Sequence, residues 1–248
     1  DTFGVSIDCE KTAPYRYYIA NVNDMKSGSI EKWLLSTLSV SNSLLESKSI
    51  KDRIVLEDVP SGREYLEPII DAMKKNRFIH ICYFNYWKGD TRDHYVMPLC
   101  VKLFRQRWYM VGRNWPAGRN LVFCLDRIRD FRISSHTFKF PEDFDTQEYF
   151  NGCIGVIPGD RCGIEKVKIK ASSGQANYLR DLPLHDSQQE TEQTDEYSIF
   201  ELLVRPTFDF QQELLWNGED LEVLEPLWLR KEVAGKIKRM WNRYKEDE

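Results

Sequence analysis

The sequence has no cysteine pair at C-x-x-C spacing and no long apolar run. Its six cysteines are scattered over 248 residues, whereas a zinc ribbon needs paired ligands and a disulfide scaffold needs a smaller, denser chain. No stretch approaches the roughly 20 apolar residues of a membrane helix. With 42% hydrophobic and 13% aromatic residues, disorder is excluded as well. We therefore expect a soluble, cytoplasmic protein with free thiols.

Motifs of the common enzyme classes are also missing. The four histidines show neither H-E-x-x-H nor H-x-E spacing, and neither a G-x-S-x-G elbow nor a phosphate loop ending in Lys-Ser/Thr occurs. A nucleophile pair could still combine Cys82 or Cys100 with His80 or His94, but strand cysteines are usually inert small hydrophobes. The sequence predicts no enzyme, no cofactor and no metal site.

Charge is distributed unevenly along the chain, although the net charge is only −4. Residues 77–133 contain 11 basic and four acidic residues, whereas residues 164–248 contain 12 basic and 18 acidic ones. The basic stretch is mostly arginine, which suits phosphate, and it is interspersed with tyrosine and tryptophan. Two interpretations stay open: an anion or nucleic-acid surface, or an arginine-rich barrel whose aromatic residues form its core.

The N-terminal part predicts a hairpin and two helices. Two alternating apolar runs around a polar turn indicate a hairpin over residues 3–21. Apolar residues at helical spacing indicate a helix over residues 30–38. The motif Ser61-Gly62-Arg63-Glu64 matches a capping box and predicts a second helix near residues 62–76, kinked or delayed by Pro68.

From residue 77 the pattern changes to strands and then to alternating strands and helices. Five short strands between residues 77 and 133 predict a small barrel. A Gly/Pro-rich linker over residues 141–163 follows. Strands at residues 166–171, 197–204 and 221–224 alternate with helices at 175–180, 210–216 and 229–244, and the polar residues 186–196 are predicted to be a loop. The fold class is α+β, with a two-layer C-terminal domain.

Three separated motifs resemble one family of bacterial transcriptional regulators. Residues 97–112, MPLCVKLFRQRWYMVG, and residues 123–128, FCLDRI, resemble the WYL domain, with Met110 in place of the usual leucine. Residues 184–188 and 218–226 resemble the WCX extension that follows WYL. The opening hairpin resembles the wing of a winged helix-turn-helix domain.

The resemblance implies a domain order and a function. It divides the chain into a wing hairpin remnant (1–23), a helical linker (24–76), a Sm/SH3-like WYL barrel (77–140), a linker (141–163) and a WCX α+β domain (164–248). It implies a ligand-sensing and dimerising region whose barrel binds an anionic effector, single-stranded nucleic acid or a nucleotide, while DNA is bound by the N-terminal winged helix. His94 and Leu121 stand where the family commonly has arginine.

Candidate ligand residues come from the basic stretch and its tyrosines. Because neighbouring strand residues point to opposite faces, we expect Trp108 in the core and Tyr109 at the ligand surface. We expect Arg113, Arg119 and Arg127 to share one face. The predicted ligand-binding residues are Tyr83, His94, Arg105, Tyr109, Arg113, Arg119 and Arg127. The alternative is a protein-interaction or structural barrel without a small ligand, and a catalytic role would require turnover of a nucleic-acid or nucleotide substrate.

Overall fold

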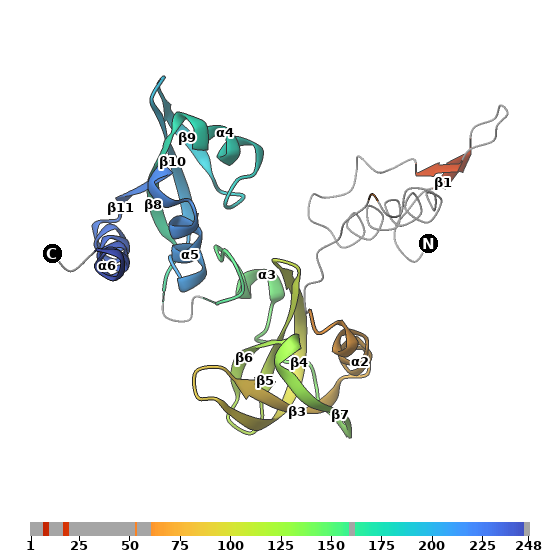
Figure 1. The fold of residues 1–248 in the computed structure, drawn as a ribbon. Helices are drawn as coiled ribbons and strands as arrows, with labels where there is room; N and C mark the ends of the chain where they lie inside the picture. Colours follow the sequence, from red (N-terminus) through yellow and green to blue (C-terminus); the bar gives the residue numbers. More distant parts are fainter. Residues whose placement is uncertain (1–6, 10–16, 20–52, 54–60, 159–161, 246–248) are drawn as a thin grey trace. The chain divides into compact units, whose positions relative to one another are not determined.

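The computed structural model is an α+β protein, as predicted, and it describes residues 7–9, 17–19, 53, 61–158 and 162–245. The chain divides into two compact units, residues 1–58 and 59–248. The described residues of the second unit form two antiparallel sheets with helices against them (Figure 1).

The described part of the first unit includes the predicted hairpin. Strands β1 (Ile7–Cys9) and β2 (Tyr17–Ile19) pair antiparallel, with Asp8 opposite Tyr18. The helix predicted over residues 30–38 lies outside the described residues. The resemblance of this hairpin to a wing stays a prediction.

Helix α2 (Arg63–Lys74) forms where predicted, but its cap differs from the prediction. Its N-cap residue is Gly62 in the left-handed region, with φ +62° and no side-chain hydrogen bond to the helix. Ser61 is buried one residue earlier, so the capping box is wrong. Pro68 lies inside the helix and does not delay its start.

The five predicted strands between residues 77 and 133 are all present, and four of them are longer than expected. They form one antiparallel sheet in the order β6-β5-β4-β3-β7 (Figure 1). The strands are β3 (Arg77–Asn85), β4 (Asp90–Phe104), β5 (Arg107–Asn114), β6 (Arg119–Cys124) and β7 (Ile128–Thr137).

This sheet curls because a very short turn joins its two edge strands. The 3-10 turn η3 (Leu125–Arg127) links β6 directly to β7, and three residues span at most about 10 Å. The two edges therefore meet at η3. No pairing within the described part of the chain joins β6 to β7, so a closed barrel of hydrogen bonds, expected from the sequence, is not formed there.

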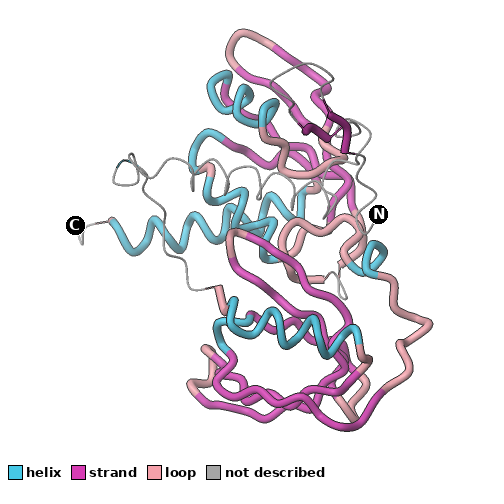
Figure 2. The backbone as a smooth tube through the Cα atoms, turned by 90° about the vertical axis from the view of Figure 1, so that its right-hand side faces the viewer, coloured by secondary structure: helices cyan, strands magenta, loops and turns pink. Residues whose placement is uncertain are grey.

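Each face of the curled sheet is apolar and packs against a different segment. On one face the helix α2 lies against the strands (Figure 2) and covers a core that includes Ile79, Met110 and Phe123. On the other face Val111 packs against Phe144, next to the short helix α3 (Thr146–Tyr149) of the predicted linker. The linker is therefore ordered against the sheet over this stretch.

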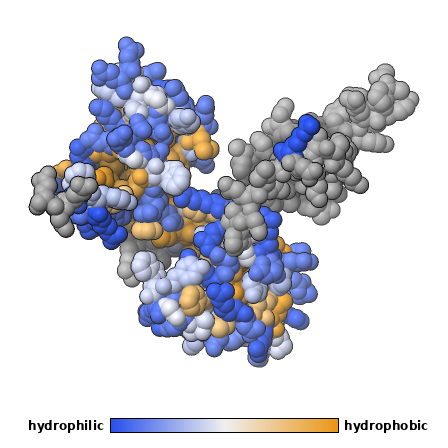
Figure 3. All heavy atoms as spheres, viewed as in Figure 1, coloured by the Kyte–Doolittle hydropathy of each residue, from blue (hydrophilic) through white to orange (hydrophobic). Residues whose placement is uncertain are grey.

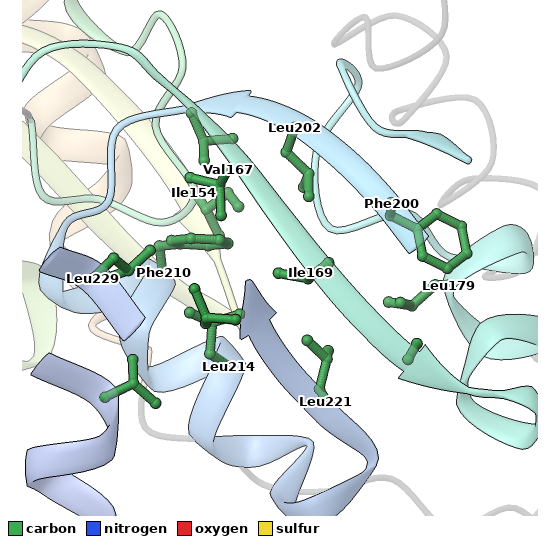
Figure 4. Packing of buried hydrophobic residues seen from close by; sticks show 14 of the residues in the cluster. Ile154, Val167, Ile169, Leu179, Phe200, Leu202, Phe210, Leu214, Leu221 and Leu229 are labelled. Atoms are coloured by element: carbon green, nitrogen blue, oxygen red, sulfur yellow. The ribbon is translucent and has the colours of Figure 1, made fainter. Parts of the chain in front are cut away.

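Residues 165–244 form the C-terminal part of the second unit. Their strands make a second sheet, in the order β11-β8-β10-β9, and helices pack against one face of it. Its core joins alternate residues of β8 and β10 to side chains of α4, α5 and α6, and Figure 4 shows Phe210 and Leu214 among Ile169 and Leu229. The elements are β8 (Glu165–Ser172), α4 (Ser173–Asp181), β10 (Tyr197–Val204), α5 (Phe208–Trp216), β11 (Leu221–Glu225) and α6 (Leu227–Tyr244). The described surface in Figure 3 is mostly hydrophilic, with hydrophobic residues in patches.

The predicted loop over residues 186–196 is wrong in part, because β9 (Gln189–Gln193) is an edge strand. Every residue of β9 is exposed, so the strand has no apolar alternation that could have predicted it. Its backbone pairs with β10, and Glu190 accepts hydrogen bonds from the Arg180 guanidinium at 2.6 and 2.9 Å. This pairing holds the pKa of Glu190 at about 2, well below its ordinary value.

Candidate functional site

Three of the seven predicted ligand residues line one pocket at the β6 edge of the curled sheet. The pocket has a volume of about 780 Å³, within the range of small-molecule sites. We call it the Arg127 pocket. Its wall is formed by Tyr83, Trp87, Tyr109, Asn120, Leu121, Val122, Cys124, Arg127, Val156, Ile157, Pro158, Cys162, Thr207, Phe208 and Asp209.

Arg127 reaches this pocket from the turn η3. Its guanidinium carbon lies 4.0 Å from the centre of the Tyr86 ring, a cation–π distance. Its Nε atom is buried and has no hydrogen-bond partner within the part of the chain that the structure describes. The arginine thus packs on the Tyr86 ring, interacts with the Tyr83 hydroxyl and lines the pocket with its positive charge.

Asp126 forms an ion pair with Arg107 across the β5–β6 hairpin, and not with its neighbour Arg127. The Asp126 side chain is only 12% exposed. Solvent screens a partly buried pair of this kind less than it screens a surface pair. The pair fixes η3 to β5 and leaves Arg127 without a competing carboxylate from its own turn.

Two tyrosines flank Arg127 in the pocket and carry their protons at neutral pH. The Tyr83 hydroxyl accepts a hydrogen bond from the Cys124 N–H at 3.0 Å, and burial raises the pKa of this phenol. Burial, with Cys124 nearby, raises the pKa of Tyr109 to about 12. Both phenols can therefore donate a hydrogen bond to an anion.

The alternation predicted for Trp108 and Tyr109 agrees with their placement. Trp108 packs against the core beneath α2, as does Met110 two residues later. Tyr109 points to the other face and lines the Arg127 pocket. Its role in binding stays a prediction.

The other four predicted residues lie outside this pocket. Arg105 pairs with Glu213 of α5, and Arg113 makes two hydrogen bonds to Asp143, at 3.0 and 3.1 Å. Arg119 is exposed at the start of β6. Cys124, at the other end of β6, is five steps along the strand from Arg119, or about 17 Å. The structure therefore does not gather Arg113, Arg119 and Arg127 at one anion.

His94 does not line the pocket and packs against two aromatic rings in this structure. Its ring is 5.2 Å from Phe123 and 6.3 Å from Tyr83, edge to face in both cases. Its Nδ1 atom is 3.4 Å from Asn114 Oδ1. Burial is the main cause that lowers the pKa of His94 below its ordinary value.

We expect His94 to make the fold less stable in mild acid. Because its pKa is lower in the folded protein, the unfolded chain binds the proton more readily, and the free energy of unfolding decreases as pH falls below about 6.5. Urea unfolding at pH 7 and pH 5 should show a smaller loss for His94→Gln than for wild type. His136→Gln, at an exposed site, is the matched control, and equal losses in all three proteins would contradict the assignment.

The opposite wall of the pocket comes from the start of α5 and the segment before β8. Thr207 is the N-cap residue of α5, is 8% exposed, and its Oγ1 atom has no partner among the described residues. Asp209 accepts hydrogen bonds from the Val156 and Ile157 N–H groups at 2.8 and 3.0 Å. Sequence patterns did not indicate this wall, because its residues are far from β6 along the chain.

The described residues offer neither a metal site nor an activated cysteine at Cys100. Among them, no group of three or more His, Cys, Asp or Glu side chains could hold a metal ion. Burial raises the pKa of Cys100 to about 11, so its thiol stays protonated and is a poor nucleophile. Among the described helices, none combines the length and the apolar composition that a membrane span requires.

Comparison with known proteins identifies both halves of the second unit. Residues 64–133 match the WYL domain and residues 164–241 match the WCX domain. No curated protein matches the chain. Solved structures that are similar include proteasome accessory factor B/C (PafBC) of Arthrobacter aurescens, at 18% identity, TM-score 0.37, and coverage of 96% of this chain and 38% of that one. Another is a CRISPR Cas-related protein, at 13% identity, TM-score 0.41, and coverage of 75% and 53%.

The chain thus spans about two fifths to one half of the length of these two solved proteins. The family assignment depends on the two domain matches, which occur in the order that the sequence motifs predicted. The chain belongs to the WYL-domain proteins that carry a C-terminal WCX domain.

Proposed function

We propose that this chain is the ligand-sensing region of a bacterial transcriptional regulator and that it binds an anionic, nucleic-acid-like effector in the Arg127 pocket. The observation that supports this most directly is the state of Arg127. Its guanidinium lies over the Tyr86 ring, and the residue lines the same pocket as two protonated tyrosines, Tyr83 and Tyr109.

The chemistry of the pocket favours phosphate next to an unsaturated ring. Arginine forms charge-assisted, often paired hydrogen bonds to phosphate oxygens. Tyr83, Tyr109 and the exposed Trp87 offer rings on which bases can stack. Because Asp209 already accepts two backbone hydrogen bonds on the opposite wall, we place the phosphate on the Arg127 side.

The regulator as a whole is proposed from the family. We propose that DNA is bound by a winged-helix domain to which the β1–β2 hairpin belongs, and that the effector changes its affinity for DNA. PafBC, a similar solved protein, is named as a proteasome accessory factor. The anionic effector is not taken from that protein; it is proposed from the residues of the Arg127 pocket in this chain.

Binding to a single-stranded oligonucleotide should weaken steeply as salt rises. Each phosphate that is neutralised releases counterions, so log K falls with log[salt] by about 0.7 per phosphate contact on a single strand. Fluorescence anisotropy with a labelled single-stranded DNA between about 50 and 200 mM salt measures this slope. An affinity that is indifferent to salt over this range would rule out the proposal.

A second candidate is a protein-interaction module without a small ligand. Arg105 supports it, because this basic side chain pairs with Glu213 of the acidic C-terminal half. In that case the basic side chains of the curled sheet contact other protein surfaces instead of a ligand. A saturable, salt-dependent oligonucleotide complex would speak against this candidate.

We also propose a homodimer, and an exposed stripe on α6 is its best surface. Ile237, Met240, Trp241 and Tyr244 recur at helical spacing and are 50–81% exposed. The neighbouring Lys238, Arg239 and Arg243 are basic and exposed, whereas the exposed β9 edge of a second copy is acidic.

Light scattering should give twice the mass of the chain, and Trp241→Asp should give the monomer mass; a monomeric wild type at high concentration would contradict this.

A further inference from the structure

Gly62 contacts the backbone of the turn that holds Arg127. A Cβ atom at residue 62 would lie 2.4 Å from the carbonyl carbon of Leu125 and 2.5 Å from the amide nitrogen of Asp126. Such distances are below 3.0 Å, which real Cβ atoms essentially never show. Because both contacted atoms belong to the backbone, any side chain at residue 62 requires the start of α2 or the turn η3 to move.

The turn has little freedom to move by itself, since each of its residues is held by a different neighbour. Leu125 is fully buried in the core beneath α2. Asp126 pairs with Arg107 of β5. Arg127 lies over Tyr86 and lines the pocket. A displacement imposed at Gly62 therefore reaches the Arg127 side chain within two residues.

We infer that Gly62 is a positioning residue for Arg127, so that anion affinity in the pocket depends on where α2 begins. The inference rests on the proposed function, because it assigns a control to the same pocket. Coupling between two sites is reciprocal. A ligand on Arg127 restricts the start of α2, and a shift of that start changes the affinity for the ligand.

Gly62 lies close to the residue at which the second compact unit begins. Gly62 follows Val59, the first residue of the second compact unit, by three residues. It lines no part of the Arg127 pocket. The pocket is thus connected, through backbone contact and the buried Leu125 side chain, to the place where the chain enters this unit.

A matched pair of glycine substitutions tests the coupling. Gly62 and Gly118 both have a positive φ, +62° and +67°, but a Cβ at Gly118 meets nothing within 4 Å. Gly62→Ala and Gly118→Ala therefore both place an alanine at a positive φ, and only Gly62→Ala introduces a clash. Both variants are made in the full chain and compared with wild type well below their melting temperatures.

Two readouts are taken, one with a ligand and one without. We expect Gly62→Ala to weaken binding of a labelled single-stranded DNA about tenfold, a typical coupling, and to speed amide hydrogen exchange in residues 124–128 without ligand. Gly118→Ala should do neither. A merely structural glycine would lower the melting temperature and leave the affinity unchanged, so equal affinities and equal exchange in the two variants would overturn the inference.

A second variant, at Asp126, tests the contact between Gly62 and η3 from the side of the turn. If Gly62→Ala does not fold, Asp126→Asn weakens the pair with Arg107 and should speed exchange in residues 62–66. Asp130→Asn, which removes an exposed pair with Arg132, is its control, and equal exchange in both would overturn the coupling. A wild-type protein that binds no oligonucleotide overturns the proposed function alone, because the exchange measurements decide the coupling without ligand.

Discussion

Phe123→Ala is expected to lower the free energy of unfolding by about 3–5 kcal/mol, the usual cost of removing a buried aromatic ring. Phe123 is 2% exposed and lies in the core beneath α2. Its ring packs edge to face against Tyr83 at 5.1 Å and His94 at 5.2 Å. The cavity would therefore remove support from a pocket tyrosine as well as from the core.

Urea unfolding followed by fluorescence measures this change, and an exposed phenylalanine provides the control. Phe140 is 43% exposed, and its described ring contact is with Phe144 at 6.1 Å. Phe140→Ala should cost no more than about 1 kcal/mol, as for most surface substitutions. If the two variants lost the same stability, Phe123 would not be the core residue that its burial indicates.

Periodicity predicted the elements whose apolar residues alternate or repeat regularly. In β10 the buried Ser198, Phe200, Leu202 and Val204 alternate with more exposed residues, so both its period and its bounds follow from the sequence. The same alternation separated Trp108 from Tyr109, because it depends only on strand geometry. Family motifs added the domain order, which composition alone does not give.

Features that depend on backbone pairing or on contacts between distant residues could not be predicted. Strand β9 is polar on both faces and forms because β10 offers it an edge. The capping box failed because Gly62 takes the left-handed conformation against η3, a contact 63 residues away in sequence. In the same way Arg113 is occupied by Asp143 and Arg105 by Glu213, partners that no local spacing indicates.

Arg127→Ala is expected to weaken effector binding by about 10- to 100-fold, because a hydrogen bond to a charged group is worth about 1.5–3 kcal/mol. The melting temperature should change little, since the guanidinium packs mainly on the ring of Tyr86, and cation–π interactions at partly exposed sites contribute about 0.5–1 kcal/mol. Anisotropy with the same labelled oligonucleotide measures the affinity, and thermal unfolding measures the stability.

Arg129→Ala is the matched control for this prediction. Arg129 also lies over an aromatic ring, with its guanidinium carbon 5.4 Å from the centre of Phe84, but it does not line the pocket. Both variants remove one positive charge and one cation–π interaction, so general electrostatic attraction falls equally. Only Arg127→Ala should therefore lose the specific part of the affinity. Equal losses would mean that the basic side chains of the curled sheet attract nucleic acid without a defined site. An unfolded Arg127→Ala would mean that Arg127 supports the fold instead of binding the ligand.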